Sequence, residues 1–140
     1  MAARPANAPA VPTILLVDDD QAVRESLGCV LASEGWQVVS AATGEAALES
    51  LAEEQPDLLI TDLCLADVSG WDLLFHESIQ RPFLPIFVIT GLPRRDTGGA
   101  DRFAAMFFPK PVDLDALVTA IRRRLGASRP GQMPAPSTRP

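Results

Sequence analysis

The sequence predicts an α/β protein, a (βα)5 chain whose five parallel strands form one doubly wound sheet. Two observations and one general rule lead to this fold class. Short runs of apolar and β-branched residues alternate with segments of helical period. Right-handed crossovers between parallel strands place helices on both faces of such a sheet. Finally, 140 residues, of which 47% are hydrophobic and 21% charged, suffice for one domain with a substantial core.

The expected strands are short and mostly apolar. They lie at residues 13–17, 36–42, 57–61, 84–90 and 104–108. The first, third and fourth are apolar at nearly every position, which is typical of strands that helices cover on both faces. Because ligands bind beyond the carboxyl ends of the strands in such sheets, reactive residues should follow the strands directly.

Segments with one apolar stripe connect these strands as helices. The stripe of the first helix contains Val23, Leu27, Val30 and Leu31, and Gly35 is placed to end it. The second helix carries Ala47, Leu48 and Leu51. A capping-box-like pair, Ser69 and Asp72, predicts the start of a third helix with Leu73 and Leu74.

The last helix has the clearest pattern. It opens at Asp113 and ends in three arginines before Gly126, which suits the helix dipole. Its apolar stripe consists of Leu114, Leu117, Val118, Ile121 and Leu125. Between Thr90 and Ala104, Pro93, Gly98 and Gly99 leave room for only a short fourth helix.

Both ends of the chain differ in composition from the part between them. Residues 1–12 and 126–140 hold seven of the 13 prolines and lack hydrophobic periodicity. We therefore expect a flexible N-terminal tail at 1–12, a folded domain at 13–126 and a flexible tail containing proline and arginine at 127–140.

The composition also excludes several classes of protein. The longest run without a charged residue has 13 residues and three prolines, too short for a membrane-spanning helix, and no secretory signal pattern is present. A net charge of −6 and the lack of a second domain argue against direct DNA binding. The lack of a membrane span and of a secretory signal predicts a cytoplasmic protein. Cys29 and Cys64 lack metal-site spacing, so we expect reduced, buried thiols.

Charged and hydroxyl side chains stand at the ends of four expected strands. Asp18 and Asp19 follow the first strand, Asp62 follows the third, Thr90 ends the fourth, and Lys110 follows the fifth. Carboxylate oxygens suit Mg²⁺, and without a cation the packed carboxylates would repel one another. An ammonium and a hydroxyl suit phosphoryl oxygens. The sequence therefore predicts a magnesium and phosphoryl site at this edge of the sheet.

Each of these residues taken alone has a simpler interpretation. Acidic residues after a strand often form a loop that leads into a helix N-cap, and a single Asp62 or Thr90 is often a turn residue. Lys110 is different, since it is the only lysine among 12 basic residues and stands between two prolines. The conjunction of these groups at the strand ends favours a site.

At these residues the chain resembles the response-regulator receiver domain of two-component systems. The segments ILLVDDD, PDLLITDLCLADVSG, PIFVITG and FFPKP are similar to its four signature blocks, and the resemblance covers residues 13–126. It implies the flavodoxin-like receiver fold and a phosphoacceptor at Asp62. It also implies that Lys110 lies beside the phosphoryl group and that Thr90 and Phe107 act as switch residues.

The same resemblance implies a ligand set and a function. Asp19, Asp62 and the backbone carbonyl of Cys64 would bind Mg²⁺ directly and Asp18 through water, and the Lys110–Pro111 peptide would be cis. The implied protein accepts a phosphoryl group from a histidine kinase or histidine phosphotransfer protein. Three outputs stay open: contact with a downstream protein target, onward relay of the phosphoryl group, and homodimer formation. The protein would catalyse only its own phosphorylation and dephosphorylation, so it is not expected to be an enzyme for an outside substrate.

One departure from the family pattern and one pair of uncharged residues lead to further expectations. Lys110 follows Thr90 by 20 positions, fewer than is usual, which again predicts a shortened fourth helix. Cys64 and Leu92 are uncharged and would not orient an attacking water, which predicts a long-lived phosphoryl group.

Other functions fit the sequence less well. A phosphatase of the haloacid-dehalogenase type would need an aspartate where Cys64 stands, and no GxxxxGK[ST] or GxGxxG motif supports a nucleotide-binding enzyme. The alternative that stays open is a receiver-like interaction module that works without phosphorylation. The altered segment between Thr90 and Lys110 favours it, whereas the complete set of acidic and lysine positions does not.

Overall fold

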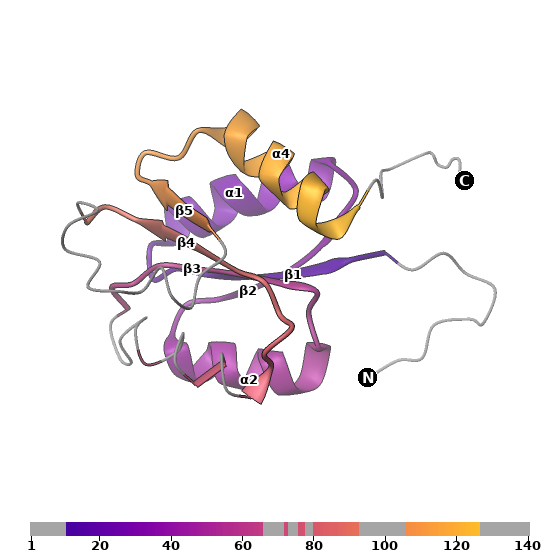
Figure 1. Ribbon diagram of the computed structural model, residues 1–140. Coiled ribbons are helices and arrows are strands. Elements are labelled where there is room, and N and C mark those ends of the chain that lie inside the picture. Colours follow the sequence, from indigo (N-terminus) through magenta and orange to yellow (C-terminus); the bar gives the residue numbers. More distant parts are fainter. Residues whose placement is uncertain (1–10, 66–71, 73–75, 78–79, 93–105, 127–140) are drawn as a thin grey trace.

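The computed structural model describes residues 11–65, 72, 76–77, 80–92 and 106–126. Its strands form one parallel sheet in the order β2-β1-β3-β4-β5. They are β1 (Thr13–Val17), β2 (Gln37–Ala41), β3 (Leu58–Thr61), β4 (Ile86–Thr90) and β5 (Met106–Pro109). The helices are α1 (Gln21–Ser33), α2 (Gly44–Glu54) and α4 (Leu114–Leu125). Figure 1 shows α1 and α4 on one face of the sheet and α2 on the other.

The predicted fold class and all five predicted strands are confirmed. The strand at 13–17 has the predicted bounds, and every residue of β1, β3 and β4 is buried, as their apolar runs indicated. The second strand is one residue shorter than predicted at each end, and Trp36, just before it, packs into the core. Strand β4 begins at Ile86 because the turn before it extends to Leu84.

The alternation of side chains along the strands divides the core into two clusters, one on each face of the sheet. Ile14, Leu16 and Phe87 point to the face under α1 and α4, where the Phe87 and Phe108 rings lie 5.6 Å apart. Leu15, Val17, Leu59 and Val88 point to the face under α2. This two-sided burial fixes the register of each strand, since a slip of one residue would exchange the two sets of side chains.

Side-chain caps set the beginnings of the helices. Asp20 caps α1 by accepting from the Ala22 and Val23 amides, and Asp113 caps α4 by accepting from the Ala116 amide. Gly35 follows α1 with a φ of 101°, a conformation that favours glycine. The predicted apolar stripe of α4 is wrong at Leu114, which is 37% exposed because it lies in the first turn, before the helix packs on the sheet.

The expectation of buried cysteines is also wrong. Cys29 and Cys64 are free thiols, as predicted, but both are exposed. Cys29 lies on the outer side of α1, and Cys64 lies in the loop after β3. Apolar neighbours in the sequence did not indicate burial here, because neighbours in a helix or a loop point in different directions.

Several predictions fall outside the described residues. Asp72, His76, Glu77 and Gln80 have helical conformation, but the predicted start at Ser69 and the leucines that follow Asp72 are not described. The shortened fourth helix and both tails, apart from residues 11 and 12, are likewise outside. Among the helices that are described, none is long and apolar enough to cross a membrane.

Candidate functional site

The predicted site residues lie where the winding of the sheet reverses. Strand β1 lies between β2 and β3 in the sheet. The chain leaves β1 toward β2 and leaves β3 toward β4, so the loops after β1 and β3 diverge at the carboxyl ends of these strands. Asp18 follows β1 directly, and Asp62 follows β3 directly. Open α/β sheets form their ligand crevice at this point.

Backbone hydrogen bonds hold these residues in place. The Asp62 amide donates to the Val17 carbonyl at 3.1 Å, and the Asp18 amide donates to the Ala41 carbonyl at 3.2 Å. Between β4 and β5, the Lys110 amide donates to the Thr90 carbonyl at 3.0 Å. Each of these bonds extends the hydrogen-bond ladder of two paired strands by one residue. The backbone of Asp18, Asp62 and Lys110 is therefore held by the sheet.

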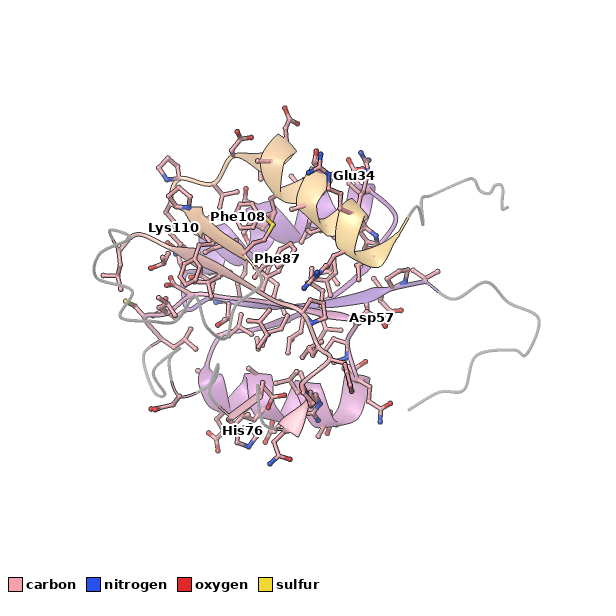
Figure 2. All side chains as sticks on the ribbon, in the orientation of Figure 1. Glu34, Asp57, His76, Phe87, Phe108 and Lys110 are labelled. Carbon is pink, nitrogen blue, oxygen red and sulfur yellow. The ribbon has the colours of Figure 1, made fainter. Side chains whose placement is uncertain are left out.

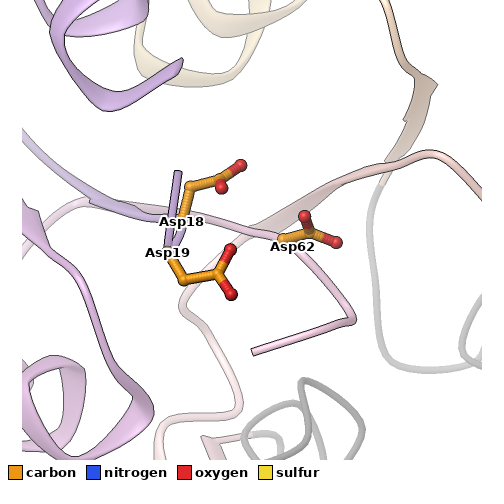
Figure 3. Close-up of side chains that lie close together, drawn as sticks. All are labelled: Asp18, Asp19 and Asp62. Carbon is orange, nitrogen blue, oxygen red and sulfur yellow. The ribbon is translucent and has the colours of Figure 1, made fainter. Parts of the chain in front are cut away.

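Three carboxylates converge at this edge (Figure 3). Asp18, Asp19 and Asp62 each offer one oxygen, and these oxygens lie within 4.8 Å of one another. Asp18 and Asp62 are buried, with 2% and 6% of their surface exposed, whereas Asp19 faces solvent. Carboxylates held this close repel one another, and burial strengthens the repulsion. The cluster therefore requires positive charge.

Lys110 supplies part of that charge. Its Nζ donates to Asp62 Oδ2 at 2.7 Å and to Asp18 Oδ2 at 2.9 Å. Burial of the ammonium by itself lowers the pKa of Lys110, but the hydrogen bonds and attraction to Asp62 and Asp18 outweigh it, so the pKa lies above its ordinary value of 10.5. One ammonium among three carboxylates leaves a formal charge of −2, which a divalent cation would balance.

The remaining oxygens of the two buried carboxylates accept from nearby amides. Asp18 Oδ1 accepts from the Asp20 amide at 2.9 Å, and Asp62 Oδ1 accepts from the Cys64 amide at 3.1 Å. These bonds fix the rotation of both carboxylates. The predicted cis peptide between Lys110 and Pro111 is present.

The two predicted switch residues lie beside this cluster but outside it. Thr90 is buried at the end of β4, and its Oγ1 accepts from the Leu92 amide at 3.1 Å, which leaves its hydroxyl hydrogen available to donate. Phe107 is half-buried on β5 and packs against the core cluster under α2. The structure thus joins Asp18, Asp19, Asp62 and Lys110 directly and places Thr90 on the strand between Asp62 and Lys110.

Sequence reasoning missed one residue at this site. Arg24, in the first turns of α1, donates from Nη1 to the Asp18 carbonyl at 2.7 Å and so ties the helix to the acidic loop. Its signal in the sequence is its spacing, because a long side chain one turn into a helix can reach back to the loop before it.

The donor set fits Mg²⁺. All three side chains offer hard oxygen ligands, as Mg²⁺ prefers, and the formal charge of −2 matches a divalent ion. Fold and site together define an α/β protein with a cluster of three carboxylates and a neighbouring lysine at the switch point of its sheet. Residues 14–122 match the response regulator receiver domain family, and the chain belongs to that family.

Similar proteins with curated descriptions are regulators. The chain is 37% identical over 122 residues to the response regulator MprA of Mycobacterium leprae (strain TN), which covers 84% of this chain and 52% of that protein. It is 36% identical over 119 residues to the transcriptional regulatory protein GlrR of Escherichia coli (strain K12), covering 84% of this chain and 27% of that protein. The chain thus spans between about a quarter and a half of these relatives.

Solved structures of receiver domains share the fold. A CheY-like receiver domain protein from Methanospirillum hungatei JF-1 matches with a TM-score of 0.78 and 30% identity, covering 83% of this chain and 94% of that one. A response regulator structure from Chloroflexus aurantiacus J-10-fl matches with a TM-score of 0.75 and 32% identity, covering 83% and 98%. The chain is therefore a response regulator receiver domain of two-component systems.

Proposed function

We propose that this receiver domain accepts a phosphoryl group on Asp62 from a phosphohistidine of a histidine kinase or histidine phosphotransfer protein, and signals through contact with a downstream protein. The observation that carries the proposal is the position of the Asp62 carboxylate. It lies in a cluster of three carboxylates, whose remaining charge a divalent cation would balance, and beside the Lys110 ammonium at 2.7 Å.

The transfer itself needs little covalent chemistry from the protein. One oxygen of Asp62 forms a bond to phosphorus as the bond between phosphorus and the imidazole nitrogen of the donor breaks, and that nitrogen takes up a proton. The Lys110 ammonium, which already contacts Asp62, would hold a phosphoryl oxygen, and the Thr90 hydroxyl would donate to another. Asp18 and Asp19 would hold Mg²⁺ together with Asp62 and the Cys64 carbonyl. When bound, Mg²⁺ offsets the negative charge of the transferred group.

The same contacts suggest how the signal leaves the site. A phosphoryl group on Asp62 adds negative charge and acceptor oxygens. The Thr90 hydroxyl would turn toward them, and Phe107 on the neighbouring strand would follow into the space that Thr90 leaves. Since this domain modifies only itself, we expect no turnover of an outside substrate. Two exposed free thiols suit a reducing compartment, which supports a cytoplasmic location.

Beryllofluoride or acetyl phosphate, each with Mg²⁺, tests the proposal on three proteins. The wild type should form the adduct, seen by intact mass with acetyl phosphate and by NMR shifts with beryllofluoride, and Asp62→Asn should lose it. Asp57→Asn is the matched control, because Asp57 precedes β3 at the opposite end of that strand. Adduct formation by Asp62→Asn would contradict the assignment of the acceptor. A wild type that forms no adduct would favour the interaction module that works without phosphorylation.

A further inference from the structure

A pair of hollows lies at the end of the sheet opposite the Asp62 cluster. In Figure 2, Asp57 marks this end and Lys110 marks the other. The first hollow measures about 530 Å³, and its lining includes Val11, Pro12, Asp57, Phe83, Leu84 and Leu125. The second measures about 400 Å³ and shares Asp57, Phe83 and Leu84 with the first. We call the two hollows together the basal groove.

Phe83 stands between the two hollows and is almost fully exposed. Its exposed fraction is 96%, the largest among the described apolar side chains. It occupies a tight turn that is closed by a hydrogen bond from the Leu84 amide to the Arg81 carbonyl at 3.0 Å. Pro82 is the second residue of this turn, so the backbone that presents the ring is constrained. An aromatic ring held in water between two depressions is typical of a contact surface.

The chain itself supplies a segment that suits this surface. It continues for 14 residues after Gly126, and four of these are prolines: Pro130, Pro134, Pro136 and Pro140. Proline-rich segments favour the extended polyproline II helix, which aromatic grooves bind at low entropic cost. We propose that residues 127–140 fold back onto the basal groove and cover the Phe83 ring.

The geometry permits this contact. Leu125 lines the first hollow, so the segment starts at the rim of the groove. In a polyproline II helix each residue adds about 3.1 Å, so Pro134 lies up to about 25 Å from Gly126, enough to cross Phe83 and enter the second hollow. A tether this short keeps the segment at an effective concentration in the millimolar range, which favours it over a second copy of the protein.

The charge of residues 127–140 is also complementary to the rim of the second hollow. The segment carries Arg129 and Arg139 and no acidic residue. Helix α2 ends next to the second hollow with Glu53 and Glu54 in its last turn. Asp57 and Arg81 both line that hollow, but Arg81 is paired with Glu77 at 2.7 Å, so the acidic groups are in excess there. The carbonyl end of a helix is itself negative. A basic segment that leaves the first hollow therefore approaches an acidic rim at the second.

Paramagnetic relaxation on the full chain tests the proposal. A nitroxide is attached at Met133→Cys in a background where Cys29 and Cys64 are serine, and amide signals are recorded. The amide signals of Gln55, Asp57, Phe83 and Leu84 should lose intensity several-fold relative to the reduced label. The same label with Phe83→Ser should lose this effect, whereas Met106→Ser, an exposed apolar residue on β5, should keep it. Because Phe83 lies outside the core of the domain, its variant should stay folded and unfold at a urea concentration close to that of the parent.

Four results would overturn the inference. The first is groove signals that keep their intensity with the label at position 133. The second is a loss of intensity that Phe83→Ser does not change. The third is the same loss in a mixture of isotope-labelled protein and separately spin-labelled protein, which would identify a second copy as the occupant. The fourth is an effect seen only with a label at Asn7→Cys, which would assign the groove to the N-terminal segment.

Discussion

Replacement of Lys110 by methionine should lower the free energy of unfolding by more than is usual for a partly exposed polar residue. Lys110 bridges two carboxylates whose side chains are only 3% and 8% exposed, at 2.9 and 2.7 Å. Each contact has a gross attraction of about 6 kcal/mol at an effective dielectric constant of about 20. Much of this is offset by desolvation, and removal of one partner of a buried ion pair costs about 3–5 kcal/mol. Since Lys110 is 28% exposed, we expect a loss near the lower end, about 3 kcal/mol.

Urea unfolding at neutral pH with EDTA, followed by circular dichroism, measures this loss. Arg122→Met is the matched control, because it removes a cation from an ion pair with Glu34 in which the arginine is 43% exposed, so it should cost less than about 1 kcal/mol. Asp18→Asn added to Lys110→Met should recover about 1 kcal/mol or more by relieving the repulsion between the carboxylates. Equal losses for Lys110→Met and Arg122→Met would refute the reasoning.

Further predictions concern pH, phosphoryl lifetime, the core and a helix cap. The pKa of Lys110 is raised in the folded state, so its contribution to stability should be complete below pH 10.5 and disappear as the pH rises through the folded value. Urea unfolding of the wild type and of Lys110→Met should therefore give free energies that converge only in that alkaline range. Phosphate release from Asp62 should be slow and should speed up in Cys64→Glu, whose carboxylate can orient water; rapid release by the wild type would contradict this. Phe87→Ala should cost about 3–5 kcal/mol in urea unfolding, since Phe87 is 1% exposed. Asp20→Ala should cost about 1 kcal/mol through loss of the α1 cap, and a loss below a few tenths would argue against that cap.

The sequence predicted the sheet well because burial on both faces leaves an unmistakable pattern. Strands β1, β3 and β4 are apolar runs in the sequence and fully buried in the structure. The site residues were predictable for a related reason, since a parallel sheet brings its strand ends to one edge. Asp18 and Asp62, 44 positions apart in the chain, could therefore be placed together from the sequence alone.

Features that depend on the direction of single side chains were not predictable in this way. Cys29 and Cys64 have apolar neighbours in sequence but point to solvent. The contact of Arg24 with the Asp18 carbonyl depends on how α1 leaves its loop. The exposure of Phe83 depends on what packs over a turn, and the composition of the turn itself gives no sign of it.

The bridge made by Lys110 also affects the order in which the domain matures. Its two ion pairs span 92 and 48 positions of sequence, so neither can form on the ribosome until nearly the whole domain has emerged. Until then the Lys110 ammonium does not offset the repulsion between Asp18 and Asp62. The repulsion is therefore offset only when β5 and Lys110 join the sheet. A nascent domain that lacks β5 should have a less stable β1–β3 pairing than the complete domain.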